Sequence, residues 1–253
     1  MPRKILGVIP ARFGSSRFPG KALAQISSKT MLQHVYERVC QARYLTGTII
    51  ATDDERIYRA AKAFGAQVRM TRADHVSGTD RVAEVASTTE SEIVVNIQGD
   101  EPLIDPAAID AAVLPLEHDP DVVMATLAKR IEDPREIDDP NVVKVVANRA
   151  GDAIYFSRCP IPFEREGRRL GRCFKHIGLY VYRRNFLLQY PSLPVGPLEE
   201  SERLEQLRAI ENGYPIRVVE TEYDSLGVDT PEDLERVSRL FEASLMQGVQ
   251  SHG

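Results

Sequence analysis

A basic loop rich in small residues directly follows the first apolar segment of the chain. This loop, residues 10–21, reads PARFGSSRFPGK and carries Arg12, Arg17 and Lys21. Glycines and serines leave backbone N–H groups accessible, and the cations offset the repulsion within a bound polyphosphate. The loop is not a Walker loop, because Ala22 stands where a serine or threonine would hold magnesium. We therefore expect a triphosphate site here, with a flexible basic surface loop as the alternative.

Two aspartates that lie far apart in the chain are candidate metal ligands. Asp100 ends the segment NIQGD, in which Gly99 allows a sharp turn after an apolar strand, and Asp229 precedes the start of a helix. Carboxylates that face phosphates are natural ligands of Mg²⁺. Gly-Asp after a strand is also an ordinary turn signal, and Asp229 could merely precede a helix cap. The residues themselves leave both interpretations open.

The segment 70–81 reads MTRADHVSGTDR and is dense in side-chain donors and acceptors. A pyrimidine base and a ribose need such groups, and Gly78 allows close approach of the backbone. The alternative is a loop whose polar side chains satisfy its own backbone. Further polar residues stand near expected strand ends or on a helix, where each alone is weak evidence for a substrate contact: Arg158, Lys175, His176, Tyr180, Tyr182, Glu205 and Gln206.

Apolar segments alternate with amphipathic ones along the first half of the chain. Segments typical of buried strands occupy residues 5–9, 48–51, 66–70 and 92–97. Helices are expected from Thr30, from near Asp53 and from Asp105-Pro106, where capping residues precede helical spacing. Strands that alternate with helices predict a doubly wound α/β fold with a mainly parallel sheet. Ligands bind beyond the carboxyl ends of strands in such sheets, which is where both the basic loop and Asp100 fall.

The second half of the chain changes character. Strand-like segments within residues 122–182 follow one another with little helix between them, which predicts a small added antiparallel portion. Helical patterns return at 202–211 and from Thr230. We expect one domain over residues 1–246 and a frayed polar tail at 247–253.

Composition excludes several classes of protein. The chain has 253 residues, 43% of them hydrophobic, and a net charge of −5. The acidic balance argues against a nucleic-acid partner, and no apolar run is long enough for a membrane helix. The three cysteines are widely separated, so neither a disulfide framework nor a zinc site is expected. No signal peptide is recognised and no GxGxxG follows the first strand, so we expect a cytoplasmic protein that is not a dehydrogenase.

Several motifs in order along the chain resemble the 3-deoxy-manno-octulosonate cytidylyltransferase (CMP-Kdo synthetase) family. They are IPARFGSSRFPGK at 9–21, MTRADHVSGTDR at 70–81, NIQGDEP at 96–102, DPNVVKVV at 139–146, YFSRCPIP at 155–162, HIGLYVYR at 176–183, LEQLR at 204–208 and GVDTPEDLE at 227–235. The resemblance implies a nucleotidyltransferase that joins CTP to 3-deoxy-D-manno-octulosonate (Kdo), gives CMP-Kdo and pyrophosphate, and uses Mg²⁺. It also implies a homodimer and a role in lipopolysaccharide biosynthesis.

The resemblance assigns roles to residues of this chain. Implied nucleotide contacts are Ala11, Arg12, Ser15, Arg17 and Lys21 at the phosphates, and Thr71, Arg72, Asp74, Ser77 and Gly78 at the cytidine. Implied Kdo contacts are Arg81, Gln98, Arg158, His176, Tyr180, Glu205 and Gln206. Asp100 and Asp229 are the implied magnesium ligands, and Lys21 and Arg12 join them as the catalytic set.

Two alternatives remain. A cytidylyltransferase for another 2-keto sugar acid, such as a sialic acid, would share the fold, the first loop and the chemistry. The motifs at 155–162, 176–183 and 204–208 favour Kdo. A catalytically silent nucleotide-binding module is the second alternative. The presence of Arg12, Lys21 and the two aspartates argues against it.

Overall fold

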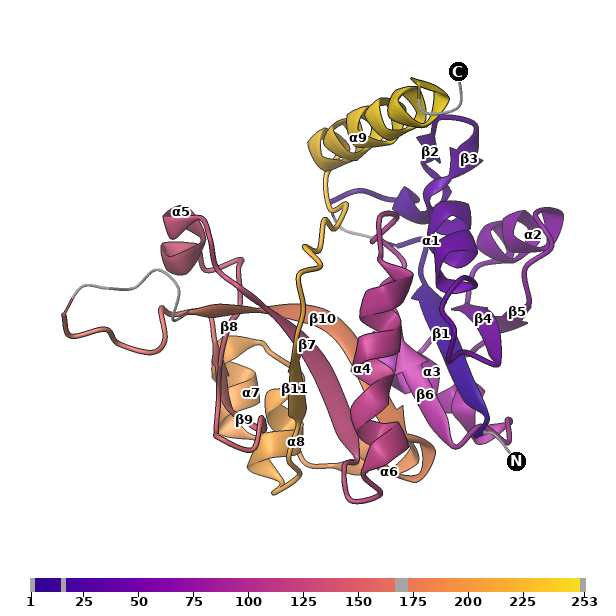
Figure 1. Ribbon diagram of the computed structural model, residues 1–253. Coiled ribbons are helices and arrows are strands. Elements are labelled where there is room, and N and C mark those ends of the chain that lie inside the picture. Colours follow the sequence, from indigo (N-terminus) through magenta and orange to yellow (C-terminus); the bar gives the residue numbers. More distant parts are fainter. Residues whose placement is uncertain (1–2, 15–16, 167–172, 251–253) are drawn as a thin grey trace.

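A twisted mixed sheet runs through the whole molecule (Figure 1). The computed structural model describes residues 3–14, 17–166 and 173–250, without the side chains of 243–250. Within this part of the chain the sheet has nine strands, and its main path has the order β11-β7-β10-β6-β1-β4-β5. These strands are β1 (Ile5–Ala11), β4 (Gly47–Thr52), β5 (Val68–Met70), β6 (Ile93–Asn96), β7 (Met124–Arg130), β10 (Phe174–Arg183) and β11 (Arg217–Glu220).

The first half of the chain forms the parallel part of the sheet. Strand β1 pairs in parallel with β4 on one side and β6 on the other, and β4 pairs in parallel with β5. The chain first builds outward from β1 to β5 and then returns to add β6 on the opposite side, so the carboxyl end of β1 is a topological switch point. Ligands bind at such points in open α/β sheets.

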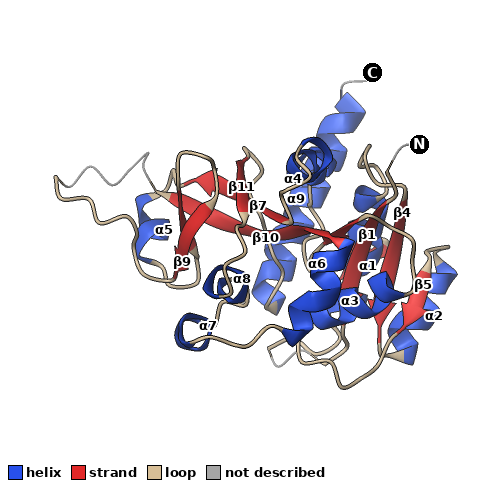
Figure 2. Ribbon diagram, turned by 90° about the horizontal axis from the view of Figure 1, so that it is seen from below, coloured by secondary structure: helices blue, strands red, loops and turns tan. Residues whose placement is uncertain are grey.

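Helices cover both faces of the sheet, which confirms the doubly wound architecture (Figure 2). Ile5 and Ile9 of β1 belong to one core cluster, whereas Leu6 and Val8 belong to another, as the alternation of a strand requires. The first face is covered by α1 (Met31–Val39), α2 (Glu55–Ala63) and α4 (Pro106–His118), and the second by α3 (Gly78–Ser87), α6 (Arg184–Gln189) and α8 (Leu207–Glu211).

The second half adds the expected antiparallel strands. Strand β10 runs antiparallel to both β6 and β7, so it is the reversed strand of the main path. Strands β8 (Lys144–Ala147) and β9 (Ala153–Ser157) extend the sheet from the other end of β10. A separate small hairpin joins β2 (Gln25–Ile26) to β3 (Lys29–Thr30), and α5 (Pro134–Asp138) lies beside the added strands.

Local capping explains most of the predicted helix starts. Thr30 accepts a hydrogen bond from the Gln33 amide, and Asp54 and Asp105 cap α2 and α4 in the same way. The helix expected over 202–211 is instead two short helices, α7 (Pro197–Glu202) and α8. The break occurs because Arg203 adopts the left-handed conformation, with φ of 54°.

The end of the chain also differs from expectation. Strand β11, which sequence periodicity did not predict, pairs in parallel with β7. The last helix, α9 (Pro231–Gln250), includes residues 247–250 of the segment expected to be frayed, whereas 251–253 lie outside the described residues. In the described part of the chain, no helix is long and apolar enough to span a membrane. The two remaining elements are 3₁₀ turns, Lys21–Leu23 and Tyr190–Ser192.

Candidate active site

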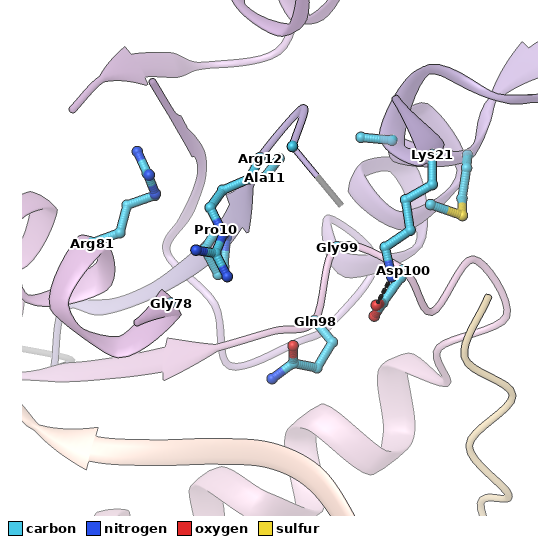
Figure 3. A pocket seen from close by; sticks show the side chains of 12 residues that line it. Pro10, Ala11, Arg12, Lys21, Gly78, Arg81, Gln98, Gly99 and Asp100 are labelled. Carbon is cyan, nitrogen blue, oxygen red and sulfur yellow. Dashed lines mark hydrogen bonds and ion pairs between the residues drawn. The ribbon is translucent and has the colours of Figure 1, made fainter. Parts of the chain in front are cut away.

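Two adjoining cavities open beyond the carboxyl ends of β1 and β6. The first has a volume of about 470 Å³ and contains Arg12, Lys21, Arg81 and Asp100 in its lining (Figure 3). The second has a volume of about 250 Å³ and is lined largely by tyrosines and uncharged polar side chains. Pro10, Gly78 and Gln98 line both cavities, so the two form one continuous site. The site therefore combines a charged half and a mostly neutral half.

The basic loop is shaped by a contact between its two ends. The Gly20 amide donates to the Phe13 carbonyl at 2.8 Å, and Gly20 has a φ of 74°. A Cβ at Gly20 would lie 2.9 Å from the Phe13 ring, so only glycine fits this close turn. The guanidinium of Arg56 stacks 3.3 Å above the same ring. These contacts fix the point at which Lys21 leaves the loop, while Arg12 lies exposed at the cavity.

Lys21 brings the two predicted carboxylates together. Its Nζ lies 2.5 Å from Asp100 Oδ2 and 2.9 Å from Asp229 Oδ1, and it also donates to the Val228 carbonyl at 3.0 Å. Arg17 pairs with the other oxygen of Asp229 at 2.8 Å. Burial lowers the pKa of Lys21, but the two carboxylates outweigh it and raise that pKa above 10.5. Asp100 and Asp229, which are far apart in sequence, thus share one cation.

Asp229 belongs to an irregular segment between β11 and α9, residues 221–230, which we call the strap. The strap crosses from the antiparallel part of the sheet toward α9 (Figure 1). The Val228 amide donates to the Asp100 carbonyl at 2.9 Å. Asp233 of α9 accepts hydrogen bonds from the amides of Asp229 and Thr230, so the helix start also fixes the position of Asp229.

Gly99 and Glu101 flank Asp100 and have structural roles that differ. A Cβ at Gly99 would lie 2.9 Å from the Pro10 carbonyl oxygen, so glycine lets the Asp100 loop approach the end of β1. Glu101 is 6% exposed and accepts a hydrogen bond from the Tyr223 hydroxyl at 2.9 Å. Burial raises the pKa of Glu101 to about 7. Glu101 points away from the charged cavity and into the protein.

The two aspartates have the chemistry that a magnesium ion requires. Mg²⁺ is usually held by one or two carboxylates together with phosphate oxygens of the substrate. Asp100 and Asp229 already converge on one cation, the ammonium of Lys21. No cluster of three or more His, Cys, Asp or Glu side chains suited to a metal occurs in the described residues. The residues therefore fit a metal that is completed by a nucleotide, rather than one held by the protein alone.

The resemblance implied that Arg81 contacts Kdo, but the structure places Arg81 in the lining of the charged cavity and not in that of the cavity lined by tyrosines. It is 1% exposed, forms an ion pair with Asp53 at 3.2 Å and donates to the Thr71 hydroxyl and the Arg72 carbonyl. Lys21 and Arg81 lie on opposite sides of Pro10–Arg12 (Figure 3). The cavity thus has a cation at each side.

The segment 71–79 is only partly turned toward the site. Gly78, at the first turn of α3, lines both cavities. Ser77 caps α3 in a capping box with Asp80, and Thr71 is buried, donating to the Thr52 carbonyl. Arg72 and Asp74 form an exposed ion pair with each other and line neither cavity. The structure therefore brings Gly78 to the site and gives its predicted companions local partners.

The second cavity is lined by buried aromatic and polar side chains. Tyr180 and Tyr182 come from β10, Tyr190 follows α6, and Glu205 and Gln206 precede α8. The Tyr190 hydroxyl donates to the Glu205 carbonyl at 2.7 Å. Burial raises the pKa of each tyrosine, so all three are neutral. Burial also raises the pKa of Glu205 above 4.5, although Thr79 and Arg208 oppose this shift.

Two predicted Kdo contacts do not line either cavity. The Arg158 guanidinium donates to the Glu202 and Pro140 carbonyls at 2.8 and 2.9 Å. The His176 ring packs between Phe156 and Tyr180 and hydrogen bonds to Thr126 at 2.9 Å. Burial lowers the pKa of His176 to about 3, so this ring is neutral. His176 therefore supports Tyr180 from behind, and Arg158 is held by backbone carbonyls.

The remaining predicted residues are distributed as follows. The first cavity is lined by Ala11, Arg12, Lys21, Gln98 and Asp100. The second cavity is lined by Gln98, Tyr180, Glu205 and Gln206. Beside Lys21 lie Asp229, which pairs with it, and Arg17, which pairs with Asp229. Lys175 lies outside both cavities, in ion pairs with Glu136 and Asp224. Ser15 lies outside the described residues.

Sequence reasoning missed three polar residues in or next to the site, namely Asn96, Tyr190 and Asp53. Asn96 is 3% exposed and lines the second cavity, and its Oδ1 has no hydrogen-bond partner in the described part of the chain. Leaving such a group unsatisfied costs about 1–3 kcal/mol. Asp53 pairs with Arg81. Asn96 ends one apolar strand of the parallel sheet and Asp53 follows another, and this position was the signal that could have identified these two.

Comparison with known proteins agrees with this geometry. The family model described as "Cytidylyltransferase" matches residues 6–221. The 3-deoxy-manno-octulosonate cytidylyltransferase of Solibacter usitatus is 79% identical over 249 residues, covering 98% of this chain and 99% of that relative. The protein of the same name from Geobacter sulfurreducens is 55% identical over 245 residues, covering 92% of this chain and 97% of that relative.

A solved structure has the same fold. The structure of CMP:2-keto-3-deoxy-manno-octonic acid synthetase complexed with CTP superposes with a TM-score of 0.91 at 45% identity, covering 95% of this chain and 99% of that one. The match spans both the parallel strands and the added antiparallel strands. The chain belongs to the 3-deoxy-manno-octulosonate cytidylyltransferase family.

Proposed function

We propose that this protein transfers CMP from CTP to the C2 hydroxyl of Kdo, giving CMP-Kdo and pyrophosphate. The observation that carries the proposal is the continuity of a charged cavity, in which Lys21 joins Asp100 and Asp229, with a neutral aromatic cavity. The names of the relatives and the CTP bound in the solved structure support it. Each half suits one substrate.

The charged cavity suits the nucleotide. Arg12, Arg17 and Lys21 supply positive charge for the triphosphate, and Gly78 leaves room beside the first turn of α3. In this assignment Arg81 is a second cation at the opposite side of the same cavity. Phosphoryl and nucleotidyl transfer depend mainly on positioning and on neutralisation of charge, so a site built from cations and backbone suffices.

Asp100 and Asp229 are the proposed ligands of Mg²⁺. When bound there, the ion would supply charge neutralisation at the phosphates and would lower the pKa of a coordinated hydroxyl. Lys21 now occupies the position between the two carboxylates. With the ion bound to the carboxylates, the Lys21 ammonium would be available to contact phosphate oxygens, because the carboxylates would then have another cation as partner.

The aromatic cavity suits the sugar acid. Its Tyr, Gln and Asn side chains offer hydrogen-bond donors and acceptors to hydroxyl groups, and Gln98 lies where the two cavities join. The C2 oxygen forms a bond to the α-phosphorus, the bond from that phosphorus to the bridging oxygen breaks, and pyrophosphate leaves. The proton of the C2 hydroxyl group passes to water. No histidine lines either cavity among the described residues, so the proposal uses no histidine base.

The proposal also covers the compartment, the oligomeric state and the pathway in which the reaction takes place. The family resemblance supports a cytoplasmic homodimer whose product enters lipopolysaccharide biosynthesis. The net charge of −5 supports a small-molecule substrate rather than nucleic acid as partner. Size-exclusion chromatography with light scattering would measure the assembly directly, and a monomer at micromolar concentration would contradict the dimer.

The function is tested by pyrophosphate release. Purified protein with CTP, Mg²⁺ and Kdo should release pyrophosphate, whereas omission of Mg²⁺ should abolish release. Parallel reactions with a sialic acid should be at least about 100-fold less efficient in kcat/KM, because buried polar groups are left unpaired by a poorly matched substrate. Faster turnover of the sialic acid would contradict Kdo as the acceptor, and CTP binding without turnover of either acid would support a silent nucleotide-binding module.

A further inference from the structure

The position of Asp229 depends on a segment without regular secondary structure. The strap, residues 221–230, connects β11 to α9 and includes neither helix nor strand. A carboxylate on such a segment is not fixed by a backbone ladder, so other contacts must set its distance from Asp100. Small errors in such distances reduce the rate of reactions that depend on positioning. The contacts of the strap therefore matter for the site.

The strap is attached to the Asp100 loop by hydrogen bonds that lie behind the charged cavity. The Tyr223 hydroxyl donates to Glu101 Oε2 at 2.9 Å, and the Val228 amide donates to the Asp100 carbonyl at 2.9 Å. Ser225 of the strap also lies near the Glu101 carboxyl group and acts to lower its pKa, against the larger effect of burial. Glu101 and Asp100 are adjacent, so a tie to Glu101 acts directly on the backbone that carries Asp100.

The burial of Glu101 needs an explanation that packing does not supply. Its side chain is 6% exposed, beside a Tyr223 ring that packs against the main core cluster. A carboxyl group is costly to bury unless its hydrogen bonds are satisfied, and an apolar residue of similar size would fill the same volume. Glu101 lines neither cavity. Its carboxyl group instead accepts a hydrogen bond from Tyr223 of the strap.

The strap is also held by the antiparallel part of the sheet. Asp224 pairs with Lys175 of β10 at 2.8 Å and with Lys129 of β7 at 3.3 Å. Tyr223 and Asp224 are neighbours, so the strap is fixed on one side to β7 and β10 and on the other to the Asp100 loop. The two attachments together define where the strap continues toward Asp229.

We propose that the Tyr223–Glu101 hydrogen bond is a positioning contact that sets the separation of the Asp100 and Asp229 carboxylates. Both residues act through the aspartates and touch neither substrate. This inference rests on the proposed function, because it assigns the two carboxylates to a shared Mg²⁺ beside CTP. It predicts that loss of the contact changes the Mg²⁺ requirement more than the binding of the sugar.

The central test is Tyr223→Phe, which removes one hydroxyl and changes no charge. Mg²⁺ is titrated calorimetrically into protein with CTP in the absence of sugar, so the readout is binding without turnover. We expect the half-saturating Mg²⁺ concentration to rise about three- to tenfold, as for the loss of one hydrogen bond. The kcat should fall by a similar factor, while KM for Kdo should stay within twofold.

Hydrogen exchange supplies a second readout. The Val228 amide should exchange about three- to tenfold faster in Tyr223→Phe, because its acceptor is the Asp100 carbonyl on the tied loop. Tyr36→Phe is the matched control: the Tyr36 hydroxyl accepts from the Gln67 amide at 3.3 Å, far along the chain from the strap. The control should change neither the Mg²⁺ titration nor the exchange of Val228.

Variants at Glu101 separate positioning from general stability. Glu101→Gln keeps an oxygen that accepts from Tyr223 and should restore most of the Mg²⁺ affinity lost in Glu101→Leu. If Glu101→Leu does not fold, Tyr223→Phe still decides the matter. An unchanged Mg²⁺ titration in a folded Tyr223→Phe, with an active wild type, would overturn the positioning role alone. A wild type that binds CTP without regard to Mg²⁺ would instead overturn the proposed function.

Discussion

The two halves of the site use different physical means to bind their ligands. In the charged cavity, Lys21 lies between two carboxylates and Arg81 forms an ion pair with Asp53. The aromatic cavity has tyrosines that burial keeps neutral, and its polar groups are amides, hydroxyls and one carboxyl group. Electrostatic attraction thus dominates the first half, and hydrogen-bond geometry dominates the second.

The difference explains how one site selects two unlike substrates. Charge attracts any polyphosphate and acts over several ångströms, so it gives binding with little discrimination among sugars. Buried amides and hydroxyls discriminate strongly, because a ligand without the matching groups leaves them unpaired. We therefore expect variants in the charged half to alter CTP and Mg²⁺ dependence, and variants in the aromatic half to alter Kdo dependence.

The largest effect is expected for Asp100→Asn in the charged half. This change removes a carboxylate that the structure places on the shared cation, and turnover should fall at least about 10²–10³-fold. Glu90→Gln, which alters an exposed carboxylate paired with Lys4, should have no effect on turnover. Pyrophosphate release at saturating CTP and Kdo measures both. A loss smaller than tenfold in Asp100→Asn would contradict the metal-ligand role.

Lys21→Met should reduce kcat/KM for CTP by about ten- to 100-fold and leave KM for Kdo within twofold. The reason is that its ammonium is the central charge of the first cavity, whereas the second cavity does not include it. Lys29→Met is the control, because Lys29 pairs with Glu37 near the surface. An equal effect on both substrates would break the division into two halves.

Glu205→Gln should show the opposite selectivity. KM for Kdo should rise about three- to tenfold with CTP binding unchanged, and Glu200→Gln on exposed α7 is the control.

Because burial raises the pKa of Glu205 above 4.5, its ionised form is less favourable in the folded protein. Stability is therefore lost as pH rises through the folded pKa. The variant should be more stable than wild type above that pH, and thermal unfolding between pH 4 and 8 would show it.

The smallest effect on activity is expected for His176→Gln, since His176 supports Tyr180 without lining either cavity. KM for Kdo should stay within threefold.

The pKa of His176 in the folded protein, about 3, lies below the usual 6.5, so the contribution of His176 to stability is lost as pH falls from 6.5 toward 3. The loss is at most about 1.4 kcal/mol per pH unit. Unfolding scans should show a shallower acid dependence in His176→Gln than in the exposed control His118→Gln.

Strand periodicity and capping residues predicted most of the frame of the site. The positions of the basic loop and Asp100 followed from apolar segments that end at one edge of a parallel sheet. The approach of Asp229 to Asp100 had no such basis, because the strap has no periodicity; it followed from the family resemblance alone. Physical contacts that no local pattern records, such as Lys21 with Val228, complete the site.

The errors have identifiable physical causes. The break at Arg203 was missed because a non-glycine residue adopts a left-handed conformation there. Strand β11 has only four residues and takes its strand form from pairing with β7. The role predicted for Arg158 stays a prediction: its guanidinium is held by two backbone carbonyls and lines neither cavity. Residue type alone cannot reveal which neighbour a side chain meets.

The reversed strand β10 has a consequence for biosynthesis. It fills the space between β6 and β7, and it also supplies Tyr180 and Tyr182 to the aromatic cavity. A nascent chain that has emerged only as far as residue 173 therefore leaves open the edges of β6 and β7 that β10 covers, and it lacks the two tyrosines that β10 supplies. Such edges pair readily with other chains. Ribosomal pausing before this strand should favour aggregation, whereas pausing after it should allow the sheet to close.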